Sequence, residues 1–115
     1  MSKPVAHYSA SHRAGDLLFV SGQVGIADGS LVEGVQSQTL QALNNVQAVL
    51  GQSVLTLEHV VKCTVFMTDI DNFAVINATY AEVFGDHRPS RSAVAVKALP
   101  LGALVEIEAI AHTSS

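Results

Sequence analysis

Two glutamates and one arginine are the residues of this sequence best placed for chemistry on a small molecule. Glu106 and Glu108 lie two residues apart in an alternating stretch, so on a strand their side chains share one face. Paired carboxylates can do acid–base work, although a solvated sheet face holds such a pair more often. Arg91 stands at the head of the apolar run 93–96, where its guanidinium could hold a carboxylate bidentately. An ordinary arginine at a strand edge is the alternative interpretation.

Motifs for other chemistries are absent from the sequence. It has no phosphate-binding glycine loop, no G-x-S-x-G, no H-E-x-x-H and no C-x-x-C. His59 and Cys63 are four residues apart, which suits two metal ligands on a helix, but they lie in or beside a predicted strand. We therefore do not expect a metal pair at these two residues, and we interpret Cys63 as a small core residue. A single cysteine also excludes an intrachain disulfide.

Length and composition predict one small domain that assembles with copies of itself. The domain spans 1–115, and the chain is 49% hydrophobic and only 14% charged. A domain of this size cannot hide that much apolar surface, so we expect part of it to be buried in a homo-oligomer.

The charge pattern and hydropathy exclude several kinds of partner. The formal net charge is −4 and the six Lys and Arg residues are scattered, which argues against a nucleic-acid binder. No apolar run approaches the roughly 18 residues that span a membrane, and the N-terminus does not resemble a signal peptide. A soluble protein of the reducing cytoplasm is the simplest expectation.

The residues of interest fall on an alternation of strands and helices. Strands are predicted at 17–24, paired with 5–12, and at 60–68, 90–97 and 103–112, with a hairpin turn at Asp28-Gly29 that returns through 30–32. Helices are predicted at 36–50, ended by Gly51, and at 71–84, capped by Asp69 or Asp71 and ended by Gly85. This order predicts an α+β domain, with one mixed sheet and two helices on one face.

The alternating strands also predict which residues face the core. In the strand at 60–68 one face carries Val61, Cys63, Val65 and Met67, and in the last strand one face carries Val105, Ile107, Ala109 and Ala111. The opposite face is apolar enough, with Phe66, Leu104 and Ile110, that we expect a partner subunit to cover it.

Several segments, in order along nearly the whole chain, resemble the RidA (YjgF) family. They include 18–23 (LFVSGQ), 61–69 (VKCTVFMTD), 77–80 (NATY), 87–92 (HRPSRS) and 106–111 (EIEAIA). The resemblance implies a chorismate-mutase-like fold and a homotrimer with active sites in the clefts between subunits. It implies hydrolytic deamination of 2-aminoacrylate and related 2-imino acids to 2-keto acids and ammonia, without metal or cofactor.

The resemblance also implies roles for individual residues. The carboxylate-binding arginine of the family falls on Arg91 and its water-positioning glutamate on Glu106. The remaining implied substrate-binding residues are Tyr8, Ser21, Gly22 and Asn77. Many members carry a cysteine two residues after the arginine, where this chain has Ala93.

These roles define one enzymatic hypothesis and two alternatives. Arg91 would fix the carboxylate of an imino acid, and Glu106 would aim a water at its C=N carbon. In the first alternative the protein is a regulatory trimer that binds a keto acid without catalysis. In the second it is a ribonuclease, an activity sometimes attached to this family, against which the acidic composition weighs.

Overall fold

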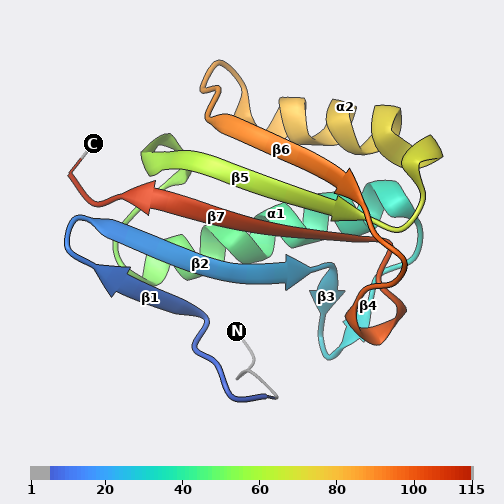
Figure 1. The fold of residues 1–115 in the computed structure, drawn as a ribbon, viewed down its shortest axis with the longest axis horizontal. Coiled ribbons are helices and arrows are strands. Elements are labelled where there is room, and N and C mark those ends of the chain that lie inside the picture. Colours follow the sequence, from blue (N-terminus) through green and yellow to red (C-terminus); the bar gives the residue numbers. More distant parts are fainter. Residues whose placement is uncertain (1–5, 115) are drawn as a thin grey trace.

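The computed structural model describes residues 6–114 as a five-stranded mixed sheet with two helices packed on one face (Figure 1). The strands of this sheet are β1 (Ser11–Ala14), β2 (Leu17–Val24), β5 (Val60–Met67), β6 (Ser90–Ala95) and β7 (Val105–His112), in the spatial order β1-β2-β7-β5-β6. Strands β5 and β6 run parallel and the other neighbours antiparallel. The α+β prediction is therefore confirmed.

The parallel pair follows from the helix that connects it. Helix α2 (Phe73–Phe84) joins β5 to β6, and a crossover of this length brings the chain back in the same direction. Helix α1 (Val35–Gln52) packs beside α2 and covers β2 and β7. A small hairpin of β3 (Ile26–Ala27) and β4 (Ser30–Leu31) lies between β2 and α1, with Asp28 and Gly29 in the left-handed turn that the sequence predicts.

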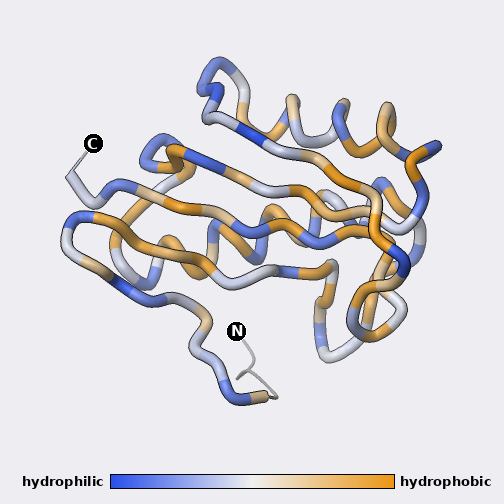
Figure 2. Tube along the Cα trace, in the orientation of Figure 1, coloured by the Kyte–Doolittle hydropathy of each residue, from blue (hydrophilic) through white to orange (hydrophobic). Residues whose placement is uncertain are grey.

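The core lies between the helices and one face of the sheet. Hydrophobic and hydrophilic residues alternate along β7 (Figure 2), and the predicted inward residues, from Val105 to Ala111, are all buried. Leu43, Val46 and Leu50 of α1 are fully buried against them, as their helical spacing predicts. The helix runs past Gly51 to Gln52 and is capped by Ser53, so the predicted end at Gly51 is wrong by one to two residues.

The predicted pairing of 5–12 with β2 is misplaced along the chain. Strand β1 covers Ser11–Ala14, and it turns through Gly15, with φ at +60°, into β2. Residues 1–5 lie outside the described part of the chain. The alternating character of the segment before Ser11 was too weak to mark where pairing begins.

Strand β5 contains a bulge that the alternating pattern does not reveal. Val60 pairs with Ala111 and Lys62 with Ile110, so Val61 is an extra residue on this strand. Val61 is consequently 45% exposed while Val60 is buried, and the prediction that Val61 faces the core is wrong. Cys63, Val65 and Met67 lie beyond the bulge and are buried as predicted.

The remaining boundaries differ by a few residues. Asp69 caps a short 3-10 turn, 70–72, and α2 itself begins at Phe73, whose ring is partly exposed rather than in the core. Gly85 ends α2 with φ at +64°, as predicted. Strand β6 ends at Ala95 and β7 begins at Val105, so each is two residues shorter than its predicted range, and a 3-10 turn, Pro100–Gly102, lies in the connection between them.

No helix of residues 6–114 packs on the second face of the sheet. Phe66, Leu104 and Ile110 lie on it partly exposed, together with Phe19 and Val94, each about two-fifths exposed. We call this the open face. Among residues 6–114, no helix has the length and hydropathy needed to cross a membrane.

Candidate functional site

Arg91 lies on the helix-covered side of the sheet. In β6 it is in register with Cys63 of β5, and Cys63 in turn pairs with Ala109 of β7. Residues paired across strands point to the same face, so Arg91 points toward the helices, as buried Cys63 and Ala109 do. Strand β6 is the edge of the sheet, which leaves the Arg91 side chain half-buried beside α2.

Helix α2 holds the Arg91 guanidinium through neutral groups. Nη1 donates a hydrogen bond of 2.8 Å to Oδ1 of Asn77, and Cζ lies 4.8 Å from the ring centroid of Tyr80 and 5.8 Å from that of Phe73. No Asp or Glu oxygen of the described chain forms a salt bridge with Arg91. We call Arg91, Asn77, Tyr80 and Phe73 the arginine cluster.

Beneath the arginine cluster lies the only cysteine of the chain. Cys63 is fully buried as a free thiol. Burial raises its pKa, and the nearby Arg91 charge only partly opposes this effect. Burial also raises the pKa of Tyr80, so the phenol that stacks under the guanidinium stays neutral. The cluster therefore offers one positive charge and no internal anion.

Glu106 lies on the open face, not on the face of Arg91. It alternates with Val105 and Ile107, which are buried under the helices. Burial raises the pKa of the Glu106 carboxyl, and the charge of Glu108 on the same face raises it further. Glu106 therefore holds its proton to a higher pH than an exposed glutamate, as suits a group that exchanges a proton with a bound molecule.

Ser21 and Gly22 lie beside Glu106 in a bulge of β2. Val20 pairs with Ala109 and Gln23 with Ile107, so three steps along β2 match two along β7. The Ser21 hydroxyl donates a 2.7 Å hydrogen bond to the carbonyl of Ser9, and the Ser21 backbone N–H donates to Ala10. These two hydrogen bonds hold the segment before β1 against β2. Tyr8 lies in this segment, and its side chain is 51% exposed.

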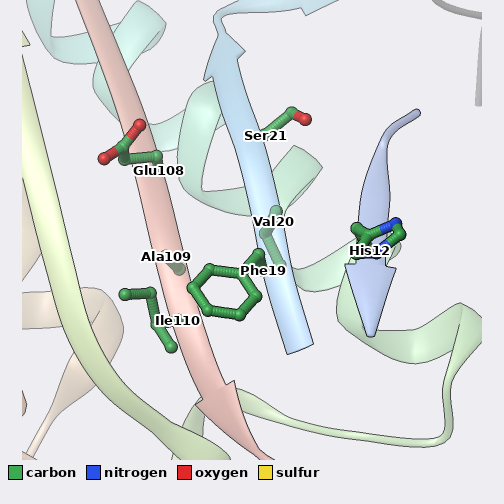
Figure 3. Close-up of a pocket in the computed structure, with 7 residues that line it drawn as sticks. All are labelled: His12, Phe19, Val20, Ser21, Glu108, Ala109 and Ile110. Carbon is green, nitrogen blue, oxygen red and sulfur yellow. The ribbon is translucent and has the colours of Figure 1, made fainter. Parts of the chain in front are cut away.

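A hollow of about 400 Å³ opens over β1, β2 and β7 on the open face (Figure 3). The phenyl ring of Phe19 and the side chain of Ile110 form its apolar wall, and His12, Ser21 and Glu108 supply polar groups. Neither His12 nor Phe19 was predicted as a site residue. Alternation along β2 would have placed Phe19 on the open face, since its neighbours Leu18 and Val20 are buried.

The predicted site residues therefore fall into two groups on opposite faces of one sheet. Arg91 and Asn77 are in hydrogen-bond contact beside α2. Glu106 and Gly22 are in contact on the open face, with Ser21 next in the chain. A single chain does not bring the two groups together. In the described residues, no group of three or more His, Cys, Asp and Glu side chains is placed to hold a metal.

Sequence comparison matches residues 1–113 to the family model described as endoribonuclease L-PSP. A RutC family protein of Pyrococcus horikoshii is 43% identical over 113 residues, covering 96% of this chain and 90% of the relative. Among solved structures, E. coli TdcF with bound serine has a TM-score of 0.93 and 36% identity, covering 97% of this chain and 92% of that one.

RidA from the Antarctic bacterium Psychrobacter sp. is similar at a TM-score of 0.92 and 36% identity, covering 95% of this chain and 90% of that one. Together the matches extend over nearly the whole chain, including both groups of site residues. The chain therefore belongs to the endoribonuclease L-PSP family, which includes the RutC, YjgF and RidA proteins.

Proposed function

We propose that this protein hydrolyses 2-imino acids, including the imine tautomer of 2-aminoacrylate, to 2-keto acids and ammonia. The observation that carries the proposal is the Arg91 guanidinium, which is half-buried and held only by the neutral groups of Asn77, Tyr80 and Phe73. A partly desolvated cation without an internal counter-ion favours an anionic ligand. The planar guanidinium matches a carboxylate with two parallel hydrogen bonds.

The chemistry requires little beyond positioning and one proton acceptor. Arg91 fixes the substrate carboxylate and, with it, the adjacent C=N carbon. Glu106 takes a proton from water while the water oxygen bonds to that carbon and the C=N π electrons move to nitrogen. Glu106 returns this proton to nitrogen, which gives a neutral carbinolamine. The hydroxyl proton then passes to nitrogen through the Glu106 carboxylate as the C–N bond breaks, which releases ammonia and the 2-keto acid. The raised pKa of Glu106 suits both halves of this exchange.

This mechanism needs two copies of the chain at each site, because Arg91 and Glu106 lie on opposite faces of the sheet. A copy that lays its open face near the edge strand of a neighbour would bring one arginine to one glutamate. Such a head-to-tail contact uses different patches on the two partners, and it repeats until a ring closes. We propose a homotrimer, in agreement with the family resemblance and the uncovered apolar residues of the open face.

A structural relative lends support to a small carboxylate as ligand. E. coli TdcF, which shares 36% identity with this chain, was solved with bound serine, an amino acid whose carboxylate neighbours an amine-bearing carbon. A 2-imino acid presents the same carboxylate beside a carbon bonded to nitrogen. The substrate class proposed here therefore differs from that ligand chiefly in the oxidation level of one bond.

The test is competition between hydrolysis and trapping of a short-lived imine. An amino-acid oxidase generates the 2-imino acid in the cuvette, and semicarbazide captures whatever has not hydrolysed. The protein should lower the rate of semicarbazone formation from the imine and raise that of free keto acid release. If it binds pyruvate yet leaves both rates unchanged, the protein is a keto acid binding module and the enzymatic proposal fails.

Ribonuclease activity is the second candidate, because the matching family model carries the description endoribonuclease L-PSP. The formal charge of −4 and the scattered basic residues disfavour binding to a polyanion. RNA cleavage that weakens steeply with added salt and disappears in Arg91→Ala would favour this candidate over imine hydrolysis.

A further inference from the structure

Gly22 and Glu106 touch at a point where a side chain at position 22 would have to push the Glu106 side chain aside. A Cβ built on Gly22 would lie 2.8 Å from Cδ of Glu106 and closer still to Oε2. Distances of this size do not occur between a real Cβ and its neighbours, so a side chain at position 22 must displace the carboxyl. Gly22 is not among the glycines with positive φ, so its backbone conformation does not call for glycine. The position of the Glu106 carboxyl, by contrast, leaves no room for a side chain at position 22.

We infer that Gly22 is a positioning residue: its missing side chain lets the Glu106 carboxyl lie against the backbone of β2 and aims it for water activation. This inference rests on the proposed function and assigns Gly22 a role distinct from contact with substrate. Gly22 lies two residues before Val24, which pairs with Glu106, so Gly22 is the diagonal neighbour of Glu106 on the open face.

Other glycines of the chain provide matched controls. A Cβ on Gly25 would meet the Gln38 backbone of α1 at 2.6 Å rather than the Glu106 carboxyl, so Gly25→Ala tests crowding against α1. Gly51 lies in the last turn of α1 with nothing within 4 Å, and Gly51→Ala should be harmless.

The first measurement is a stability cycle that does not depend on catalysis. Gly22→Ala should lower the Tm of the assembled protein by roughly 2–4 °C when Glu106 is present, because the flexible end of the Glu106 side chain has to move aside. In a Glu106→Ala background the obstructing atoms are gone, and the same Gly22→Ala change should cost little. An equal loss of Tm in both backgrounds would show that the two residues do not constrain each other, and it would overturn the inference.

The second measurement follows the carboxyl itself. NMR titration of carboxyl-labelled glutamate should show that Gly22→Ala brings the pKa of Glu106 down toward the ordinary glutamate value, because the displaced group gains solvent. Gly25→Ala should destabilise the protein without moving this pKa. An unchanged Glu106 pKa in Gly22→Ala contradicts the inference.

The third measurement separates positioning from substrate binding. In the imine assay Gly22→Ala should reduce kcat by about tenfold or more, while pyruvate affinity at Arg91 changes little. The acid limb of its pH profile should move to lower pH with the pKa of Glu106. If wild-type protein gives no acceleration at all, the proposed function fails, but the stability cycle and the titration still decide the Gly22–Glu106 contact.

Discussion

The two faces of the central sheet surround their charged residues with groups of opposite effect. On the helix-covered face, Arg91 is held by a hydrogen bond to Asn77 and by the rings of Tyr80 and Phe73, all from α2. On the open face, Glu106 has a glycine beside it and a second carboxylate, Glu108, nearby. One face surrounds a cation with groups that support its charge, and the other surrounds an anion with groups that oppose its charge.

This difference assigns separate tasks to the two faces. A supported cation keeps its charge at any physiological pH and is suited to binding. A carboxyl whose charge is disfavoured gains and loses a proton more easily near neutrality and is suited to proton transfer. In the proposed trimer, the geometry between the two groups would be set by how two copies of the sheet pack. The following variants test this division, beginning with the largest effect.

Arg91→Ala should abolish the acceleration of keto acid release, because nothing else in the arginine cluster carries a charge. The variant loses the cation that would pair with the pyruvate carboxylate, so its affinity for pyruvate should fall roughly 30-fold or more. Arg91→Lys keeps the charge and loses the bidentate geometry, so it should recover only part of the activity. Isothermal titration with pyruvate and the imine assay measure the two effects.

The matched control for this prediction is Lys97→Ala, which removes one exposed positive charge just beyond the end of β6. It should leave both binding and turnover unchanged. Full turnover in Arg91→Ala would remove the basis of the proposed function.

Glu106→Gln should reduce turnover by roughly 100-fold and leave pyruvate binding nearly intact, since it removes the proton acceptor but not the cation. In wild-type protein, activity should fall as the pH drops through the pKa of Glu106, which lies above the ordinary glutamate value. The variant should lose this acid limb. A fully active variant would mean that a different group accepts the proton from water.

Mixing the two inactive variants, Arg91→Ala and Glu106→Gln, should restore activity. When Arg91→Ala and Glu106→Gln chains are unfolded together and refolded at equal amounts, about a quarter of the interfaces should combine an intact Arg91 with an intact Glu106. The rate per site should then recover to about a quarter of the wild-type value. Absence of any recovery in verified mixed oligomers would place both residues in one chain's site and contradict the two-copy arrangement.

Tyr80→Leu should have the mildest effect of these changes. Loss of the ring beneath the guanidinium should weaken pyruvate binding roughly 2- to 30-fold, the range of a cation–π contact. Tyr80→Phe keeps the aromatic face and should bind nearly as well as wild type. If the two variants weaken binding equally, the hydroxyl and not the ring face supports Arg91.

Much of this arrangement could be predicted from the sequence because the strands alternate cleanly. The buried residues of β7 and the helical stripe of α1 followed directly from periodicity. The bulges at Val61 and at Ser21-Gly22 did not. Val60 and Val61 are both apolar, so hydropathy does not show which of them faces the core, and neither Ser21 nor Gly22 marks an apolar face. The prediction for Val61 failed for this reason, and the close approach of Gly22 to Glu106 was not foreseen.

The arginine cluster shows a similar limit. Phe73 and Tyr80 flank Asn77 at helical spacing and face the arginine, and Tyr80 is also buried in the hydrophobic core. Spacing places residues on one side of a helix, but it does not say whether a cation or another apolar group lies opposite. That depended on the register of β6 beside β5, which no local pattern in Ser90–Ala95 specifies.

The buried thiol of Cys63 can be used to measure local opening of the structure. With its pKa raised by burial and no solvent exposure, Cys63 should resist alkylating reagents as long as β5 and β6 stay packed under α2. The rate of labelling would then report how often the structure opens directly beneath Arg91. A mass spectrometer and a simple thiol reagent would thus measure how often this region opens, and whether a bound keto acid keeps it closed.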